Sequence, residues 1–398
     1  MRWMPTKMAV LVASVSAALV LSACGGGGSD TSTRVTYTSL VSFGDSLSDV
    51  GTYKVGAIAA VGGGRWTVNG TTTGPVNWTE LLAGEFSVAA PCPAQTGLLS
   101  NVPQIPLVAV VNNANCTNYA QGSSRVSLPF GPNAVALQPY IAPATNIGLM
   151  AVPVKTQFTT HLAAHGNYTG NELVTVLAGA NDIFMYANAV SAAAAGGAGA
   201  VGAAALAGWT PTEQNAVAAG GAAAVNAAAT AAVTHAAQDA AVLATAIKDS
   251  VTGMGAKHVV VVNVPSIEFT PFGQGSGAGA LLRSMVTTFN GTLKNELAGV
   301  STVLIVDAYT QGIAQYNDPA PYGIKNVTDA ACSSDAPSAT NPAGNILLGS
   351  SLACTVNNTL AGKDVSAYFY ADSVHPTPAG YKLLYRYVAK QMAIAGWL

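Results

Sequence analysis

Four short runs rich in Val, Leu and Ile alternate along this chain with longer stretches of helical character. The runs lie at residues 39–43, 172–177, 258–264 and 302–306, and turn residues bound each of them. Runs of this length and composition are typical of strands that are buried on both faces. Strands that alternate with helices favour a mainly parallel sheet covered by helices on both faces, with ligands at the carboxyl ends of the strands.

Three stretches predict covering helices. Residues 210–213, Thr-Pro-Thr-Glu, form a capping box with proline at the first helical position, so a helix begins there and runs toward Asp249. A break is expected at Gly220-Gly221. Two further helices are predicted over residues 280–298 and 377–393.

Three other segments lack a clear period. Residues 187–207 are almost all Ala, Gly, Ser and Val, which is typical of an Ala-rich helix or of a loop insertion. Residues 62–144 and 317–364 are long connections between periodic segments. Connections of that length in a compact domain are usually functional or disordered, and here we expect them to build pocket walls.

Chemically useful residues lie at the two ends of the chain. Ser46 follows the first strand-like run in Gly-Asp-Ser-Leu, and Asp372 precedes His375 in Asp-Ser-Val-His-Pro. A serine hydroxyl attacks well at neutral pH only when an imidazole removes its proton, and the imidazole needs a group that fixes its tautomer. Three residues of separation let a short turn bring the carboxylate to the far ring nitrogen. The sequence therefore predicts a triad of Ser46, Asp372 and His375.

Each of these residues also has a plainer interpretation. Gly-Asp-Ser alone is typical of a strand followed by a polar turn, and His375 alone could mark the start of the helix at 377–393. Asp45 and Asp182 are interpreted as turn or hydrogen-bonding residues. The other four histidines have no acidic residue at a triad-like spacing, and we interpret them as structural or solvated.

Four sequence blocks together resemble the SGNH, or GDSL, family of esterases and lipases. Ser46 matches the first marker residue in Phe-Gly-Asp-Ser-Leu-Ser-Asp-Val-Gly, and Gly122 matches the second in Asn-Tyr-Ala-Gln-Gly. Asn181 matches the third in Leu-Ala-Gly-Ala-Asn-Asp-Ile-Phe. His375, with Asp372, matches the fourth. The resemblance implies an α/β three-layer sandwich with a mainly parallel central sheet, a serine nucleophile, and no metal or organic cofactor.

The resemblance also implies an oxyanion hole. Its donors would be the backbone N–H groups of Ser46 and Gly122 and the side-chain amide of Asn181. The family often has Gly-Gly in the second block, whereas here Gln121 precedes Gly122 and Ser123 follows it.

The N-terminus predicts export. Arg2 and Lys7 precede an apolar stretch over residues 8–20, which is too short to cross a bilayer and is typical of a signal peptide. The following Leu-Ser-Ala-Cys-Gly resembles a bacterial lipobox, which implies a leader over 1–23 and a lipid on Cys24; ordinary signal cleavage is the alternative. Residues 24–36 would then be a flexible Gly/Ser tether before a hydrolase domain over 37–398. If the source is Gram-negative, the same resemblance implies the outer membrane, because glycine follows Cys24; a secreted protein is the alternative.

Four more cysteines predict disulfide bonds, as is usual in exported proteins: Cys92, Cys116, Cys332 and Cys354. They allow three connectivities, of which pairing between sequence neighbours is favoured. Each neighbour pair would brace a segment ahead of a site block. None of the spacings is Cys-x-x-Cys, so a zinc site is not expected.

Composition limits the partners. Charged residues make up only 9% of the chain, and without Arg2 and Lys7 the mature protein has 14 basic and 18 acidic residues, a net charge of about −4. The absence of a basic cluster argues against nucleic acid as a partner.

We therefore expect a serine esterase or lipase of neutral substrates. Alternatives are an acyltransferase or phospholipase with the same triad, a polysaccharide deacetylase, or an inactive surface binding protein. The oligomeric state is not predicted.

Overall fold

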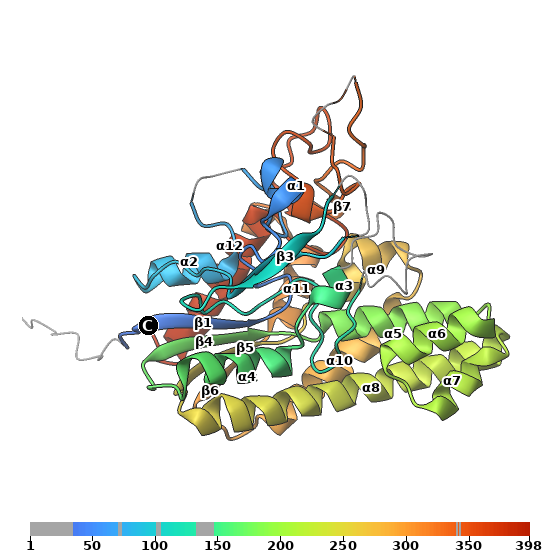
Figure 1. The fold of residues 1–398 in the computed structure, drawn as a ribbon, viewed down its shortest axis with the longest axis horizontal. Coiled ribbons are helices and arrows are strands. Elements are labelled where there is room, and N and C mark those ends of the chain that lie inside the picture. Colours follow the sequence, from blue (N-terminus) through green and yellow to red (C-terminus); the bar gives the residue numbers. More distant parts are fainter. Residues whose placement is uncertain (1–34, 71–73, 101–104, 133–146, 340, 342–343) are drawn as a thin grey trace, which may run out of the picture. The chain divides into compact units, whose positions relative to one another are not determined.

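A parallel sheet of four strands lies at the centre of the structure, a computed structural model that describes residues 35–70, 74–100, 105–132, 147–339, 341 and 344–398. The strands are β1 (Ser39–Gly44), β4 (Glu172–Leu177), β5 (His258–Val262) and β6 (Val303–Val306), hydrogen-bonded in the order β1-β4-β5-β6 (Figure 1). Every pairing in this sheet is parallel. The four predicted strands and the parallel sheet are confirmed.

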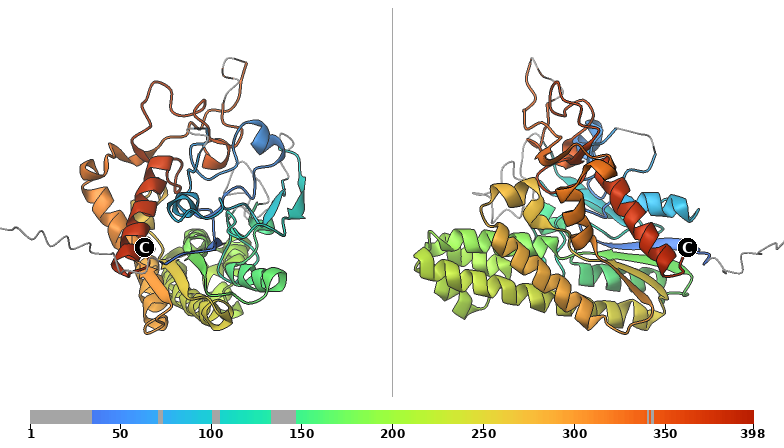
Figure 2. Two further views of the ribbon diagram at one scale, coloured as in Figure 1. Left: turned by 90° about the vertical axis from the view of Figure 1, so that its left-hand side faces the viewer. Right: turned by 180° about the vertical axis from the view of Figure 1, so that it is seen from behind.

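Helices cover both faces of this sheet (Figure 2). Successive strand residues point to opposite faces, and alternate residues enter two separate cores. The first core lies under α4 (Val154–His165), α5 (Ala180–Ala193), α8 (Gly221–Ser250) and α10 (Gly279–Glu296). The second lies under α2 (Trp78–Glu85) and α12 (Pro378–Ile394). The three-layer α/β sandwich predicted from the sequence is thus confirmed.

The predicted helix boundaries follow their local signals. Helix α7 (Pro211–Ala218) begins after Thr210, whose hydroxyl accepts from the Glu213 N–H at 3.4 Å, while the Glu213 carboxylate accepts from the Thr210 N–H at 2.8 Å. The chain breaks at Gly220, which has a φ of 71°, and continues as α8. The other two predicted helices correspond to α10 and α12.

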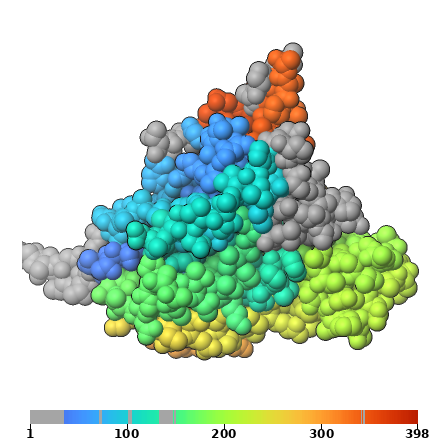
Figure 3. Space-filling model, in the orientation of Figure 1, coloured from blue at the N-terminus to red at the C-terminus, as the bar shows by residue number. Residues whose placement is uncertain are grey.

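The Ala-rich stretch is helical. It comprises the second half of α5, a short turn and α6 (Gly197–Ala207), which packs against α5 and α7. The buried face of α6 consists of Ala200, Ala203, Ala204 and Ala207. These helices form the yellow-green part of the surface at the lower right of Figure 3.

Several elements have no counterpart among the sequence predictions. In the first long connection these are α1 (Gly56–Ala60) and an antiparallel pair, β2 (Gln95–Leu98) with β3 (Val108–Asn112). Helices α3 (Ile147–Met150), α9 (Pro271–Gly275) and α11 (Ala308–Asn317) were also not predicted. The second long connection contains β7 (Asn326–Ala330), which pairs in parallel with β8 (Tyr368–Tyr370).

Two disulfide bonds join the cysteines in sequence order. Cys92 bonds to Cys116 with a Cα–Cα distance of 5.1 Å, and Cys332 bonds to Cys354 with a Cα–Cα distance of 5.8 Å. Two disulfides are typical of an exported protein. None of the helices among the described residues is long and apolar enough to cross a membrane. The predicted signal segment and Cys24 lie outside the described residues.

Candidate active site

A sharp turn places Ser46 just beyond the carboxyl end of β1. Gly44 has a φ of 144°, and a Cβ there would lie 2.1 Å from the Leu177 carbonyl oxygen of β4, so only glycine fits. The buried Gln157 side chain of α4 holds this turn from the other side. Its Oε1 accepts from the Gly44 N–H and its Nε2 donates to the Gly44 carbonyl, both at 2.9 Å.

The three predicted triad residues meet in one hydrogen-bonded chain. The Nε2 of His375 lies 2.8 Å from the Ser46 Oγ, and its Nδ1 lies 2.9 and 2.8 Å from the two carboxylate oxygens of Asp372. All three side chains belong to buried residues. Asp372 and His375 lie in the turn between β8 and α12, so the last helix brings its N-terminal side to the end of β1.

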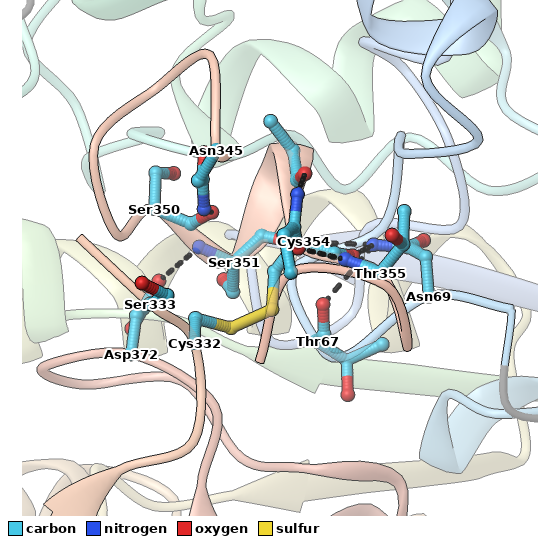
Figure 4. The surroundings of a disulfide bond; sticks show 12 residues. Thr67, Asn69, Cys332, Ser333, Asn345, Ser350, Ser351, Cys354, Thr355 and Asp372 are labelled. Carbon is cyan, nitrogen blue, oxygen red and sulfur yellow. Dashed lines mark hydrogen bonds between the residues drawn. A yellow bond between two sulfur atoms is a disulfide. The ribbon is translucent and has the colours of Figure 1, made fainter. Parts of the chain in front are cut away.

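Asp372 is held as an anion by donors on several sides. Its Oδ1 accepts from the N–H groups of Val374 and His375, and its Oδ2 accepts from the Ser351 N–H at 2.9 Å. Burial acts to raise the pKa of Asp372, but the charge of His375 and these hydrogen bonds together lower it below its ordinary value. Figure 4 shows Ser351 and Asp372 beside the disulfide of Cys332 and Cys354.

Asn69 links the two chain segments that contact the His375–Asp372 pair. On one side, the Trp66 ring packs against the His375 ring, with a centroid distance of 4.7 Å. On the other, the Ser351–Cys354 segment supplies the donor to the carboxylate. The Asn69 Nδ2 lies 3.0 Å from the Thr67 carbonyl oxygen in the first segment and 2.9 Å from the Cys354 carbonyl oxygen in the second. The sequence analysis did not identify these supporting residues.

Asn181 faces the same site from the start of α5. The chain reaches it through Gly179, whose φ is 116° and whose Cβ position would lie 2.5 Å from the Phe289 ring. One hydrogen of the Asn181 Nδ2 is donated to the Ser124 carbonyl at 2.9 Å, so the second remains for another acceptor.

A buried ion pair joins the start of α5 to the segment that follows Ser124. The Arg125 guanidinium donates from Nε to Asp182 Oδ1 at 2.7 Å, and the Val126 N–H donates to the other carboxylate oxygen at 2.9 Å. Arg125 also donates to the carbonyls of Leu206 and Ala207 at the end of α6. Asp182 is therefore a hydrogen-bonding residue, as predicted. Through Arg125, the end of α6 is hydrogen-bonded to the segment that contacts Asn181 and Asp182.

The structure corrects the prediction for Gly122. Its backbone N–H donates to Asp49 Oδ2 at 3.0 Å and is therefore committed to that carboxylate rather than free for a ligand. The buried Asp49 also accepts from the Gly51 and Thr52 N–H groups and from the Trp66 indole. The Trp66 ring leaves no room for a side chain at Gly122, since a Cβ there would lie 2.3 Å from it. This glycine is required for packing.

Asp45 carries a carboxyl oxygen with no hydrogen-bond partner among the described residues. Its Oδ1 accepts from the Leu47 N–H at 3.0 Å, while its Oδ2 is buried and unpaired. Burial raises the pKa of Asp45 to about 7, against the lowering effect of the Leu47 hydrogen bond and of His375. Asp45 is thus a turn residue, as predicted, and in addition a titratable group that lines the cavity beside Ser46.

A cavity opens directly beside these residues. Ser46, Asn181 and His375 line it, together with a mostly apolar wall from α5, α12 and β8 that includes Phe184, Leu384 and Phe369. The residues at the carboxyl ends of β4 and β5 also border this cavity, as expected for a parallel sheet. Within the described part of the chain, no group of three or more His, Cys, Asp or Glu side chains is placed to hold a metal ion.

The fold and this arrangement define an α/β protein with a Ser–His–Asp constellation at the carboxyl edge of a parallel sheet. The chain belongs to the family of GDSL-like lipases and acylhydrolases, which it matches over residues 40–388. It is therefore a hydrolase of the SGNH type. A search of curated proteins found no match to this chain.

Proposed function

We propose that the protein is a carboxylic ester hydrolase that works through an acyl-enzyme on Ser46. The observation that carries this proposal is the continuous chain from Ser46 Oγ through His375 to Asp372, with distances of 2.8 to 2.9 Å. In the first step, Ser46 Oγ attacks the ester carbonyl while His375 Nε2 takes its proton. Asp372 fixes the tautomer of the ring and stabilises the imidazolium.

The developing oxyanion needs N–H donors that are not already committed. Asn181 retains one free hydrogen on its Nδ2, and no hydrogen bond among the described residues uses the Ser46 N–H. We assign the third donor to Ser123 in place of Gly122. Ser123 has a φ of 71°, and no described residue accepts from its N–H.

Breakdown of the tetrahedral intermediate uses the same histidine in reverse. His375 gives its proton to the leaving alcohol as the carbonyl carbon–oxygen bond breaks, and a water activated by His375 then releases the acid from Ser46. An alcohol that replaced this water would make the protein an acyltransferase. The mostly apolar cavity favours acyl groups longer than acetyl, which weighs against a polysaccharide deacetylase.

Replacing the nucleophile tests the proposal directly. We expect Ser46→Ala to fold normally and to lose at least about 10³-fold in turnover of p-nitrophenyl esters, because the remaining donors and binding contacts supply only residual catalysis. The wild type should label with a fluorophosphonate probe and Ser46→Ala should not. A Ser46→Ala protein with wild-type turnover would eliminate the proposed mechanism. The buried Ser42 of β1, which donates no proton to a histidine here, provides a matched control in Ser42→Ala.

We further propose that Cys24 carries a lipid that anchors the protein in the outer membrane. The lipobox-like sequence before it and the Gly/Ser stretch after it support this proposal. A radiolabelled fatty acid should then be incorporated into the wild type and not into Cys24→Ser. Unlabelled wild-type protein in the medium would indicate ordinary signal cleavage instead.

A further inference from the structure

A second cavity lies against the catalytic histidine and is not used by the steps above. His375 and Val374 line both cavities, and no other residue is shared between the two linings. Ser46 and Asn181 line only the first cavity. Asp372 lines only the second, beside the wall that carries the disulfide of Cys332 and Cys354.

Strand β7 divides the two cavities. Val327 lines the first cavity, whereas the three residues that follow it, Thr328, Asp329 and Ala330, line the second. The paired strand β8 contributes Phe369 and Tyr370 to the first cavity only. Val374 completes the partition beside the histidine. Two separate binding volumes therefore meet at the ring that transfers the proton.

The two linings differ in chemistry. The wall of the first cavity is mostly apolar. The second is more polar, because hydroxyl groups of Thr328, Ser334, Ser350 and Ser373 and the carboxylate of Asp329 lie among its apolar residues, which include Trp66, Leu347 and Leu360. Of the described residues that line either cavity, none is Lys or Arg. The second cavity therefore suits a neutral group rich in hydroxyls and provides no cation for a phosphate.

On the basis of the proposed esterase function, we infer that the first cavity binds the acyl chain and the second binds the alcohol part of the ester, a neutral polyol such as glycerol. The reaction sequence supports this division. Ser46 Oγ bonds to the acyl carbon as its proton moves to His375 Nε2; the acyl carbon–oxygen bond then breaks and this proton passes to the alcohol oxygen. The acyl carbon must lie beside Ser46 and Asn181, whereas the alcohol must leave from the histidine. Only the second cavity adjoins His375 without Ser46.

The adjacent residues of β7 supply a matched pair of variants. Thr328→Phe would place a bulky side chain at the second cavity and Val327→Phe at the first. Both would be assayed for kcat/KM on four esters, namely the methyl and 1-glyceryl esters of lauric and butyric acid. We expect Thr328→Phe to lower kcat/KM about tenfold on both glyceryl esters and to leave both methyl esters within about twofold. We expect Val327→Phe to lower the lauroyl over butyryl preference for both alcohols.

A substrate with an added phosphate tests the charge of the alcohol site. The wild type should hydrolyse 1-lauroylglycerol about tenfold more efficiently than the lauroyl lysophospholipid with a phosphoglycerol head. Equal rates on these two substrates would overturn the inference, and so would a Thr328→Phe variant that slows all four esters equally. Ser334→Phe, at an exposed position of the same cavity, should reproduce the Thr328→Phe pattern if that strand variant fails to fold. A wild type with no activity on any ester would instead refute the esterase proposal itself.

Discussion

The side-chain amide of Asn181 has one hydrogen bonded to the protein and one free, and this asymmetry predicts the effect of its removal. Asn181→Ala should lower kcat about 10²-fold or more with little change in KM, because the oxyanion that we propose it stabilises exists only in the transition state. Steady-state kinetics with a soluble p-nitrophenyl ester would measure both constants.

A change in KM alone would instead make Asn181 a substrate-binding residue. Ser123→Gly provides the comparison for the backbone donor. It keeps the N–H and suits the φ of 71° at this position, so we expect it to keep wild-type kcat.

The same contrast between side chains and backbone explains what the sequence could predict about the site. The proposed roles of Ser46, Asp372 and His375 depend on side chains whose chemistry is visible in the residue type, and the structure brings these side chains together. The N–H of Gly122 points to Asp49, and no sequence pattern gives the direction of a backbone group in an irregular loop. Trp66 and Gln157 were missed because their roles depend on contacts made only in the folded chain.

At the scale of single elements, the loop closed by Cys332 and Cys354 is expected to control catalysis through Ser351. The sequence separation of 22 residues corresponds to about 3 kcal/mol in the chain-entropy model. In the double variant Cys332→Ala/Cys354→Ala, the Ser351 N–H should lose its fixed position on Asp372. Activity should therefore fall at a lower denaturant concentration than far-UV circular dichroism does.

The other disulfide is a control of nearly equal loop size, with a sequence separation of 24. It joins Cys92 to Cys116 beside the β2–β3 pair and does not carry a donor to Asp372. Cys92→Ala/Cys116→Ala should lose a similar free energy of unfolding but keep the activity and circular dichroism transitions closer together. Peptide mapping without reduction should show the two neighbour pairs; a bond between Cys92 and Cys332 or Cys354 would contradict this scheme.

For three of the elements that the sequence did not predict, α4, β3 and β7, the structure shows why no regular apolar pattern was present. Helix α4 buries the polar Gln157 and His161 beside Val154 and Phe158, so its inner face does not have an apolar period. Strand β3 is largely exposed, with Val110 and Val111 open to solvent, and β7 is half-exposed. The sheet strands were predictable because both of their faces are buried.

For the whole molecule, buried carboxyl groups predict how stability depends on pH. Burial raises the pKa of Asp45 to about 7 and raises that of Asp239 as well. When the pKa of a carboxyl group is higher in the folded state than in the unfolded state, the protonated group contributes to stability. This contribution is complete below the ordinary carboxyl pKa and is lost as pH rises through the folded-state pKa. The contribution of these two carboxyl groups to the free energy of unfolding should therefore fall between about pH 4 and pH 8, whereas His161, whose pKa burial lowers to about 4, contributes with the opposite sign below its ordinary pKa.

Asp45→Asn should reduce this decline, because the amide cannot ionise. Urea unfolding at intervals from pH 4 to pH 8 would measure the slope for each protein. The exposed Asp364, whose pKa is lowered by hydrogen bonds from Ser366, provides the control, and Asp364→Asn should leave the slope over this range unchanged. Identical slopes for the wild type and Asp45→Asn would show that Asp45 does not titrate there.

The contact between Ser46 and His375 spans 329 residues of sequence, which has a consequence for biosynthesis. The proposed nucleophile is synthesised long before the proposed base, which lies just ahead of α12. A nascent or truncated chain therefore holds a serine that nothing can activate. Hydrolytic activity would therefore arise only after the segment with Asp372 and His375 has been synthesised and α12 has packed against the sheet, so that the proposed esterase stays inactive while the chain is incomplete.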